Sequence, residues 1–150
     1  MALQFLVDDD VAEIIGRREL GVLGIVYGRL VNHPEVQVEI DLLEAEDMRA
    51  LNLSQRQLNE PTDVLSFPTY SGVKELNAAP KDMPLLMGSI VICPAKAAAY
   101  EETLPQLVHH GLLHLLGYDH ETDRPAWEKA EAPILAELVT AGLHIPGIPA

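Results

Sequence analysis

The chain has 150 residues, of which 48% are hydrophobic and 22% are charged, and these values are typical of a globular protein rather than a disordered, collagen-like or coiled-coil one. Because about 100–200 residues form one domain with a sizeable core, we expect a single domain over residues 1–150. The formal net charge of −13 argues against indiscriminate binding to nucleic acid, but it is compatible with a local cationic groove.

Cysteine usage and hydropathy indicate the compartment. Cys93 is the only cysteine, which excludes an intramolecular disulfide and fits a reducing environment. The first residues lack the basic region of a secretory signal, and no apolar stretch reaches the ~18–20 residues of a membrane helix. We therefore expect a cytoplasmic protein that does not act at a membrane.

The first half of the chain alternates strands and helices. Residues 2–7 predict a short strand, and apolar residues at helical spacing predict a helix from about residue 10 to residue 30. Alternating polar and apolar residues over 36–42 indicate a half-buried strand, and a short helix is expected over 45–53. Residues 61–68 predict a strand bounded by prolines.

The second half predicts one strand and then helices. Residues 70–84 are expected to form a loop, and the nearly continuous apolar residues 85–93 predict a strand covered on both faces. From residue 94 to about 143 the pattern predicts two or three helices, with Pro133 kinking or restarting the last. This order predicts an α+β (mixed α/β) fold, with a mixed sheet of about four strands and helices packed on it.

One of these helices has clear start and stop signals. Thr103 and Gln106 have the spacing of a capping box, which predicts a helix start, and Gly117 predicts the end. The residues between them are apolar apart from histidines. Because burying unpaired imidazoles on such a helix is costly, we expect something to bind them.

Three histidines of this segment are spaced as metal ligands. His110 and His114 are four residues apart and share one face of the helix, and a turn after Gly117 would bring His120 beside them. Three neutral imidazoles suit Zn²⁺, and also Ni²⁺, Co²⁺ or Cu²⁺, of which zinc is the most available. We expect about one zinc ion per chain, with a fourth coordination position open as in catalytic sites.

The same spacing occurs in the zinc-binding frame H-x-x-x-H-x-x-G-x-x-H of the metzincin proteases. Their general-base glutamate would occupy position 111, where this chain has Gly111, so a peptidase would lack its proton-transfer group. At about 100° per residue, His109 points away from the other two helix histidines and is interpreted as structural or exposed. Asp119 either orients an imidazole or caps the turn.

The segment HGLLHLLGYDH over residues 110–120 closely resembles the signature of the YbeY family, bacterial endoribonucleases and ribosomal RNA maturation factors. Further blocks match in the family's order: Leu51-Asn52, then Arg56, then PTDVLSFP over 61–68, and GSIVI over 88–92. One departure is Ser89, where the family usually has aspartate after the glycine.

This resemblance implies a zinc-dependent, single-strand-specific endoribonuclease with a zincin-like metal helix, acting in 16S ribosomal RNA maturation and ribosome quality control. It implies zinc bound by His110, His114 and His120, with His114 and Arg56 as catalytic residues. Arg56 and Asp63 are the candidate substrate-binding residues, because an arginine beside a metal can clamp a phosphate. The expected partners are single-stranded RNA, ribosomal RNA and the small ribosomal subunit with its proteins; neither DNA nor a membrane is expected.

Two other functions stay open. A non-catalytic ribosome assembly factor with a structural zinc is favoured by the acidity and by the glutamate missing at position 111, and a metallopeptidase is less favoured. For RNA cleavage, the attacking group is either a metal-bound hydroxide or, as we prefer, the RNA's own 2′-hydroxyl. In both cases a cationic patch is needed around Arg56, to which Arg49 is expected to contribute.

Overall fold

The computed structural model describes residues 2–146, and its centre is one four-stranded mixed sheet. The strands lie in the order β1-β2-β4-β3, and β1, β2 and β4 run parallel while β3 pairs antiparallel with β4. Their bounds are Gln4–Leu6 for β1, Val36–Leu42 for β2, Val64–Pro68 for β3 and Leu85–Ile92 for β4. The predicted mixed α/β fold with a four-stranded sheet is confirmed.

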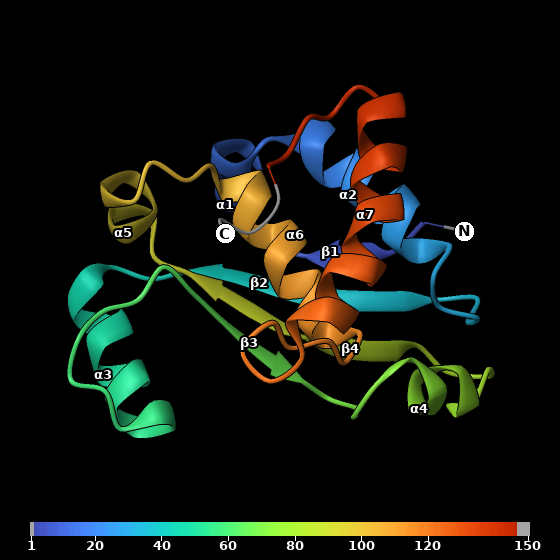
Figure 1. The fold of residues 1–150 in the computed structure, drawn as a ribbon, viewed down its shortest axis with the longest axis horizontal. Helices are drawn as coiled ribbons and strands as arrows, with labels where there is room; N and C mark the ends of the chain where they lie inside the picture. Colours follow the sequence, from blue (N-terminus) through green and yellow to red (C-terminus); the bar gives the residue numbers. More distant parts are fainter. Residues whose placement is uncertain (1, 147–150) are drawn as a thin grey trace.

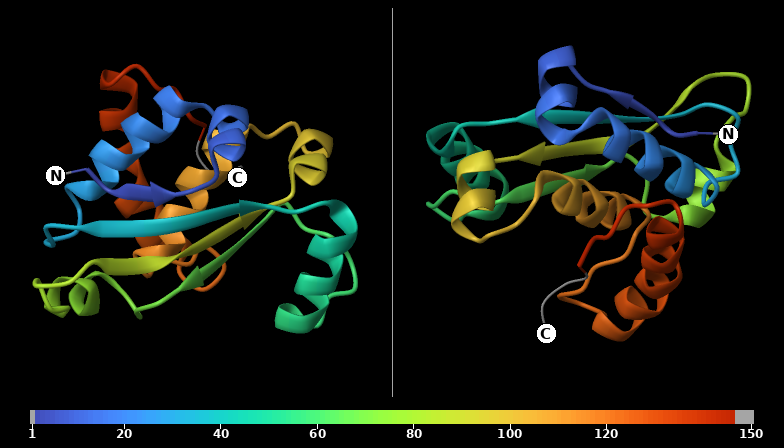
Figure 2. Two further views of the ribbon diagram at one scale, coloured as in Figure 1. Left: turned by 180° about the vertical axis from the view of Figure 1, so that it is seen from behind. Right: turned by 90° about the horizontal axis from the view of Figure 1, so that it is seen from above.

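Seven helices surround this sheet within the described residues. They are α1 (Asp9–Ile15), α2 (Arg17–Gly28), α3 (Ala45–Arg56), α4 (Val73–Ala78), α5 (Pro94–Ala99), α6 (Leu104–Leu115) and α7 (Arg124–Thr140). Helices α1, α2, α6 and α7 form a layer over one face of the sheet, and α3 and α4 lie at its opposite ends (Figures 1 and 2). None of the helices in residues 2–146 combines the length and the apolar character needed to span a bilayer.

The sheet is covered on one face more fully than on the other. In β2, Val36, Val38 and Ile40 are buried beneath the helices, while the alternating polar residues between them are partly or fully exposed. Strand β4 was expected to be covered on both faces, but Leu86 and Ser89 are only half-buried. The apolar residues of β4 are therefore explained by its position in the middle of the sheet, and not by helices packed on both faces.

Two of the predicted helical boundaries are wrong. The helix expected over 10–30 is broken into α1 and α2 at Gly16, whose φ of 118° is a left-handed conformation that favours glycine. The apolar spacing continues across this break, so periodicity alone does not reveal it. Likewise α7 continues through Pro133, which overturns the restart, one of the two expected outcomes there. This proline lies on the exposed side, where water can bind the carbonyl group left without its amide partner.

The loop predicted over 70–84 contains the short helix α4. Its stabilising contact is Leu76, which is fully buried in the main core. Six residues bounded by glycine and proline breakers give too short a pattern for helical periodicity to be recognised. Burial by the rest of the fold, rather than local propensity, forms this helix.

Helix α6 is the element that connects the core with the predicted metal site. Its capping box is present as predicted, since the Gln106 backbone N–H donates to Thr103 Oγ1 at 3.2 Å and the Thr103 N–H donates to Gln106 Oε1 at 3.3 Å. The helix ends at Leu115, just before Gly117, whose φ of 103° turns the chain back. It packs on β3 and β4 of the sheet below it (Figure 1).

Gly111 sets how closely α6 approaches the sheet. A Cβ atom at this position would lie 2.9 Å from three side-chain carbons of Ile90 in β4. Such a distance is shorter than van der Waals contact, and Ile90 is fully buried, so it has little room to move. The missing glutamate of the protease frame therefore has a structural reason: the helix leaves no space for a side chain there.

Substituting this glycine with alanine is expected to destabilise the fold. Gly111→Ala should lower the free energy of unfolding by about 1–3 kcal/mol, the usual cost of overpacking a core. The matched control is Gly21→Ala in α2, where an added Cβ meets no atom within 4 Å and helix propensity should raise stability slightly. Urea denaturation measures both variants, and a Gly111→Ala protein as stable as the wild type would contradict this packing account.

Candidate metal centre

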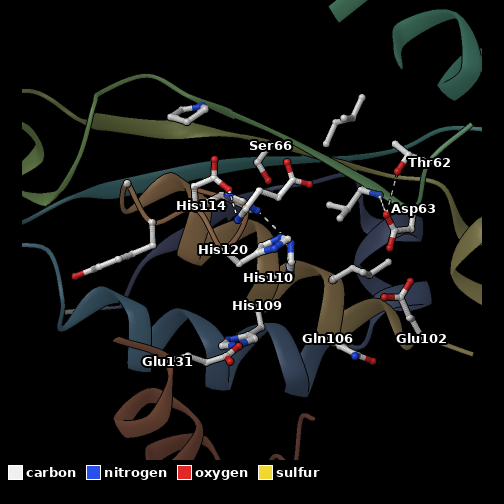
Figure 3. A pocket seen from close by; sticks show the side chains of 18 of the residues that line it. Thr62, Asp63, Ser66, Glu102, Gln106, His109, His110, His114, His120 and Glu131 are labelled. Atoms are coloured by element: carbon white, nitrogen blue, oxygen red, sulfur yellow. Dashed lines mark hydrogen bonds and ion pairs between the residues drawn. The ribbon is translucent and has the colours of Figure 1, made fainter. Parts of the chain in front are cut away.

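Three histidines meet at the end of α6. His110 and His114 come from successive turns of the helix, and the turn at Gly117 brings His120 back against them (Figure 3). One ring nitrogen from each lies within 4.8 Å of the others. His114 Nε2 and His110 Nε2 are 3.2 Å apart. The structure thus brings together all three residues that the sequence selected.

The donor set and its spacing fit a zinc ion. With Zn–N bonds of about 2.0–2.1 Å and tetrahedral angles, two imidazole nitrogens on one zinc lie roughly 3.3 Å apart. The 3.2 Å between His110 Nε2 and His114 Nε2 is close to this value. Zinc, cobalt, nickel and copper all accept three imidazoles, so the geometry favours a transition metal over Mg²⁺ or Ca²⁺, which prefer oxygen ligands.

Burial keeps two of these imidazoles in the form that binds metals. Burial, and secondly the positive charges that His114 and His120 would carry, lower the pKa of His110 to about 4. Burial is also the main cause that lowers the pKa of His114, followed by the charge of His120. Near neutral pH both rings are therefore uncharged and offer a lone pair.

Trp127 forms one wall of the cluster, which the sequence did not indicate. Its fully buried indole, near the start of α7, lies with its centroid 5.0, 4.9 and 5.0 Å from the ring centroids of His110, His114 and His120. Contact with one rigid ring restricts all three imidazoles at once. A single tryptophan several residues after the histidine segment has no spacing that would reveal this role.

His109 belongs to a separate buried network. Its Nε2 lies 2.8 Å from Glu131 Oε2 and its Nδ1 lies 2.8 Å from the Tyr27 hydroxyl oxygen. Burial, and secondly the charge of Glu131, raise the pKa of Tyr27 well above its usual value, so the hydroxyl keeps its proton. His109 is only 1% exposed, so its structural interpretation holds, and the network ties α6 to α2 and α7.

The histidines line a cleft of about 680 Å³ that also contains Arg56 and Asp63. Arg56 is the last residue of α3, is exposed, and has no hydrogen-bond or ion-pair partner among residues 2–146. Asp63 precedes β3, and its Oδ1 accepts hydrogen bonds from the Val64 N–H at 2.8 Å and from the Thr62 hydroxyl at 3.2 Å. Residues from four separate parts of the sequence thus share one cleft.

The roles expected for Arg49 and Asp119 have different outcomes. Arg49 does not line the cleft; its guanidinium group binds Glu46 and Asn59 on the exposed side of α3, so it adds no cation there. Asp119 caps the turn, as one of its two interpretations required, because its Oδ1 accepts the Glu121 backbone N–H at 2.9 Å.

Glu102 is a cleft residue that sequence reasoning missed. It lies in the turn between α5 and α6, immediately before the capping residue Thr103, and lines the cleft near Asp63 (Figure 3). In the sequence it is one of two adjacent glutamates in a polar loop, which is the ordinary pattern of a solvated turn. Only the fold places it opposite the acidic residue before β3.

Comparisons with known proteins identify a family for the chain. The family model described as Endoribonuclease YbeY matches residues 21–138, which include the three histidines and Arg56. An Endoribonuclease YbeY of Nocardia farcinica is 35% identical over 133 residues, covering 80% of this chain and 69% of that protein. One of Sulfurimonas denitrificans is 38% identical over 110 residues, covering 67% of this chain and 71% of that protein.

A solved structure shares the fold. The solution structure of TM1509 from Thermotoga maritima superposes with a TM-score of 0.51, covering 98% of this chain and 99% of that one. Its sequence identity is 22%, so this likeness concerns the arrangement of the sheet and helices rather than the chemistry of the cleft.

Proposed function

The chain belongs to the YbeY family of endoribonucleases, and we propose that its histidine cleft is the active site of a zinc-dependent endoribonuclease that cleaves single-stranded RNA. The observation that carries the proposal is the meeting of three imidazoles in one cleft with an arginine that has no partner among residues 2–146. A metal ion and a guanidinium group in one cleft suit a phosphodiester, which carries a negative charge that grows during cleavage.

His110, His114 and His120 are the residues that would hold one zinc ion. Bound there, zinc would supply positive charge for a phosphoryl oxygen. The turn after Gly117 and the wall formed by Trp127 hold the three rings in place. His114, the central ligand, is in this sense also a catalytic residue.

Arg56 is the phosphate-binding residue in this proposal. Its guanidinium group is exposed and has no carboxylate partner in the described part of the chain, so it can donate two parallel hydrogen bonds to phosphate oxygens. Asp63 lies across the same cleft, where an acceptor can bind a ribose hydroxyl or a base amine of the substrate. Together with a bound metal ion, Arg56 would supply the positive charge that offsets the repulsion expected from a chain with a net charge of −13.

Attack by the RNA's own 2′-hydroxyl is the route that needs least from the protein. Position 111 has no side chain, so the usual carboxylate base of the protease frame is missing. The remaining residues position the phosphate and stabilise its charge, which is most of what phosphoryl transfer requires. Cleavage would leave a 2′,3′-cyclic phosphate and a 5′-hydroxyl end.

The cellular role proposed for this activity is 16S ribosomal RNA maturation and ribosome quality control in the cytoplasm. Partners would be the small ribosomal subunit and its proteins, which could present a single strand to the cleft. If the cleft accepts one flexible strand but is too narrow for a stiff duplex, its width would explain specificity for single-stranded RNA.

An assay of substrate class tests the proposal. Zinc-loaded protein is incubated with a single-stranded RNA, with the same RNA in a duplex, and with peptides. We expect the single strand alone to be cut, and a strand lacking the 2′-hydroxyl at the cut site to resist cleavage. Cleavage of the deoxy-substituted strand to a 5′-phosphate would reject internal attack. Inactivity toward all RNA would favour the non-catalytic assembly factor, for which the acidic surface is the supporting observation.

A further inference from the structure

Two carboxyl groups face each other in the cleft, at the side away from His114. Asp63 comes from the residue before β3, and Glu102 comes from the turn before α6 (Figure 3). They are 39 residues apart in the chain, and the pairing of β3 with β4 together with the packing of α6 on both strands brings them together. Neither the fold nor the three-histidine site requires a second acidic residue here.

The surroundings of the pair favour one proton shared between the two carboxyl groups. Asp63 Oδ1 already accepts two hydrogen bonds, from Thr62 and from the Val64 backbone. Glu102 Oε1 is buried from solvent and, within the described chain, has no donor. Two ionised carboxylates can only accept, so a hydrogen bond between them exists only when one carries a proton. Sharing one proton removes both the unsatisfied oxygen and the repulsion between the two charges.

Glu102 is the member that keeps the proton. Burial, and then the hydrogen bond to Asp63 and its negative charge, raise the pKa of Glu102 to about 8. Asp63, by contrast, is held as an acceptor by the Thr62 hydroxyl and the Val64 N–H. At neutral pH Glu102 therefore carries the proton of the pair.

Other charged groups surround the pair at greater separation. On α5, Lys96 lies over the ring of Tyr100, with its Nζ 4.9 Å from the ring centroid, and Glu101 is exposed. The remaining titratable or charged groups that line the cleft are Arg56 from α3, Tyr70 from the loop after β3, His109, His110 and His114 from α6, Tyr118, Asp119, His120 and Glu121 from the following loop, and Glu131 from α7. Among these groups, Asp63 is the one whose charge raises the pKa of Glu102.

We propose that Glu102, protonated through its pairing with Asp63, is the general acid that donates a proton to the leaving oxygen during RNA cleavage. This inference rests on the proposed endoribonuclease function and supplies the proton-transfer group that Gly111 cannot. The 2′-oxygen forms its bond to phosphorus and loses its proton to water. The bond from phosphorus to the 5′-oxygen breaks, its electron pair stays on that oxygen, and the oxygen takes the proton of Glu102. The ionised pair then regains one proton from water.

The test compares Glu102→Gln with Glu101→Gln on two leaving groups. Both glutamates are adjacent, but Glu101 is exposed and outside the cleft. One substrate has the ordinary 5′-oxygen at a single cleavable ribonucleotide, and the other has sulfur there, which leaves as a thiolate without needing a proton. We expect Glu102→Gln to slow cleavage of the oxygen substrate by about 10²-fold or more, yet leave the sulfur substrate nearly unaffected, because only the acid is missing. Glu101→Gln should match the wild type on both.

The pH profile and a titration without RNA give independent readouts. Wild-type cleavage of the oxygen substrate should fall as the pH rises through the pKa of Glu102, and Glu102→Gln should lack this descending limb. Asp63→Asn keeps the acid but removes its partner's charge, so the limb should move to lower pH. Carboxyl-carbon NMR of the RNA-free protein, with Glu102→Gln for assignment, should show the same titration.

Three results would overturn the proposal. If Glu102→Gln slows cleavage of the oxygen and sulfur substrates equally, Glu102 has only a structural role. If Glu102→Gln cleaves both substrates at the wild-type rate, Glu102 has no role in cleavage. If the Glu102 carboxyl titrates at the usual glutamate pKa, it is ionised at neutral pH and cannot act as the general acid. In all three cases a wild-type protein that still cuts RNA would leave the proposed function intact, whereas a wild type that cuts neither substrate would end both.

Discussion

His114→Ala is expected to abolish metal binding, lowering zinc from about one ion per chain to less than a tenth of that, because two imidazoles alone bind zinc much more weakly than three. His114 is the residue whose Nε2 lies 3.2 Å from His110 Nε2, so its removal takes away the best-placed ligand pair. Elemental analysis of the wild type and the variant, purified in parallel, measures this directly. His144→Ala is the matched control, since His144 is exposed and outside the cleft.

The same variant also tests whether the bound metal stabilises the folded protein. A ligand that binds only the folded protein stabilises it by about 2.7 kcal/mol at a hundred times its Kd, so a chelator should lower the Tm of the wild type and added zinc should restore it. The Tm of His114→Ala should respond to neither treatment. Equal zinc contents in the wild type and His114→Ala would show that these histidines are not the ligands.

Arg56→Ala is expected to reduce RNA cleavage by about 10²–10³-fold, the usual cost of removing one donor that stabilises charge in the transition state. Zinc content and Tm should stay at wild-type values, because Arg56 is exposed and bonds no residue within 2–146. Arg56→Lys should recover only part of the rate, since an ammonium group lacks the planar pair of donors. Kinetics on one single-stranded RNA at saturating zinc measures all three proteins.

Arg49→Ala provides the control for general charge effects. It removes one positive charge from the same helix, but from a guanidinium group that is bound to Glu46 and lies outside the cleft. If Arg49→Ala slows cleavage as much as Arg56→Ala, the effect comes from overall charge and not from a phosphate clamp.

The sequence predicted the site well where chemistry and local structure coincide. The spacing of His110 and His114 on a helix, its capping box at Thr103 and its end near Gly117 are local features, and they determine most of the histidine geometry. His120 also followed, because a turn after glycine leaves few directions for the next residues. Arg56 came from resemblance, since an exposed arginine at a helix end has no signal of its own.

What the sequence missed depends on contacts between distant elements. Glu102 enters the cleft only because the fold brings the turn before α6 beside Asp63, and Trp127 meets the histidines only because α7 packs back over α6. Gly16 breaks a helix whose apolar periodicity continues on both sides. In each case the deciding interaction joins residues that local patterns treat separately, so periodicity and propensity could not predict it.

The most direct test of the central claim is the rate at which a single-stranded RNA is cut by the wild type and by His114→Ala, prepared identically and titrated with zinc. The account predicts that wild-type cleavage rises with zinc until about one ion is bound per chain, while His114→Ala stays at the level of the buffer. Cleavage by His114→Ala at the wild-type rate, or a wild-type rate that does not depend on zinc after complete chelation, would contradict the claim that this cleft is a metal-dependent endoribonuclease site.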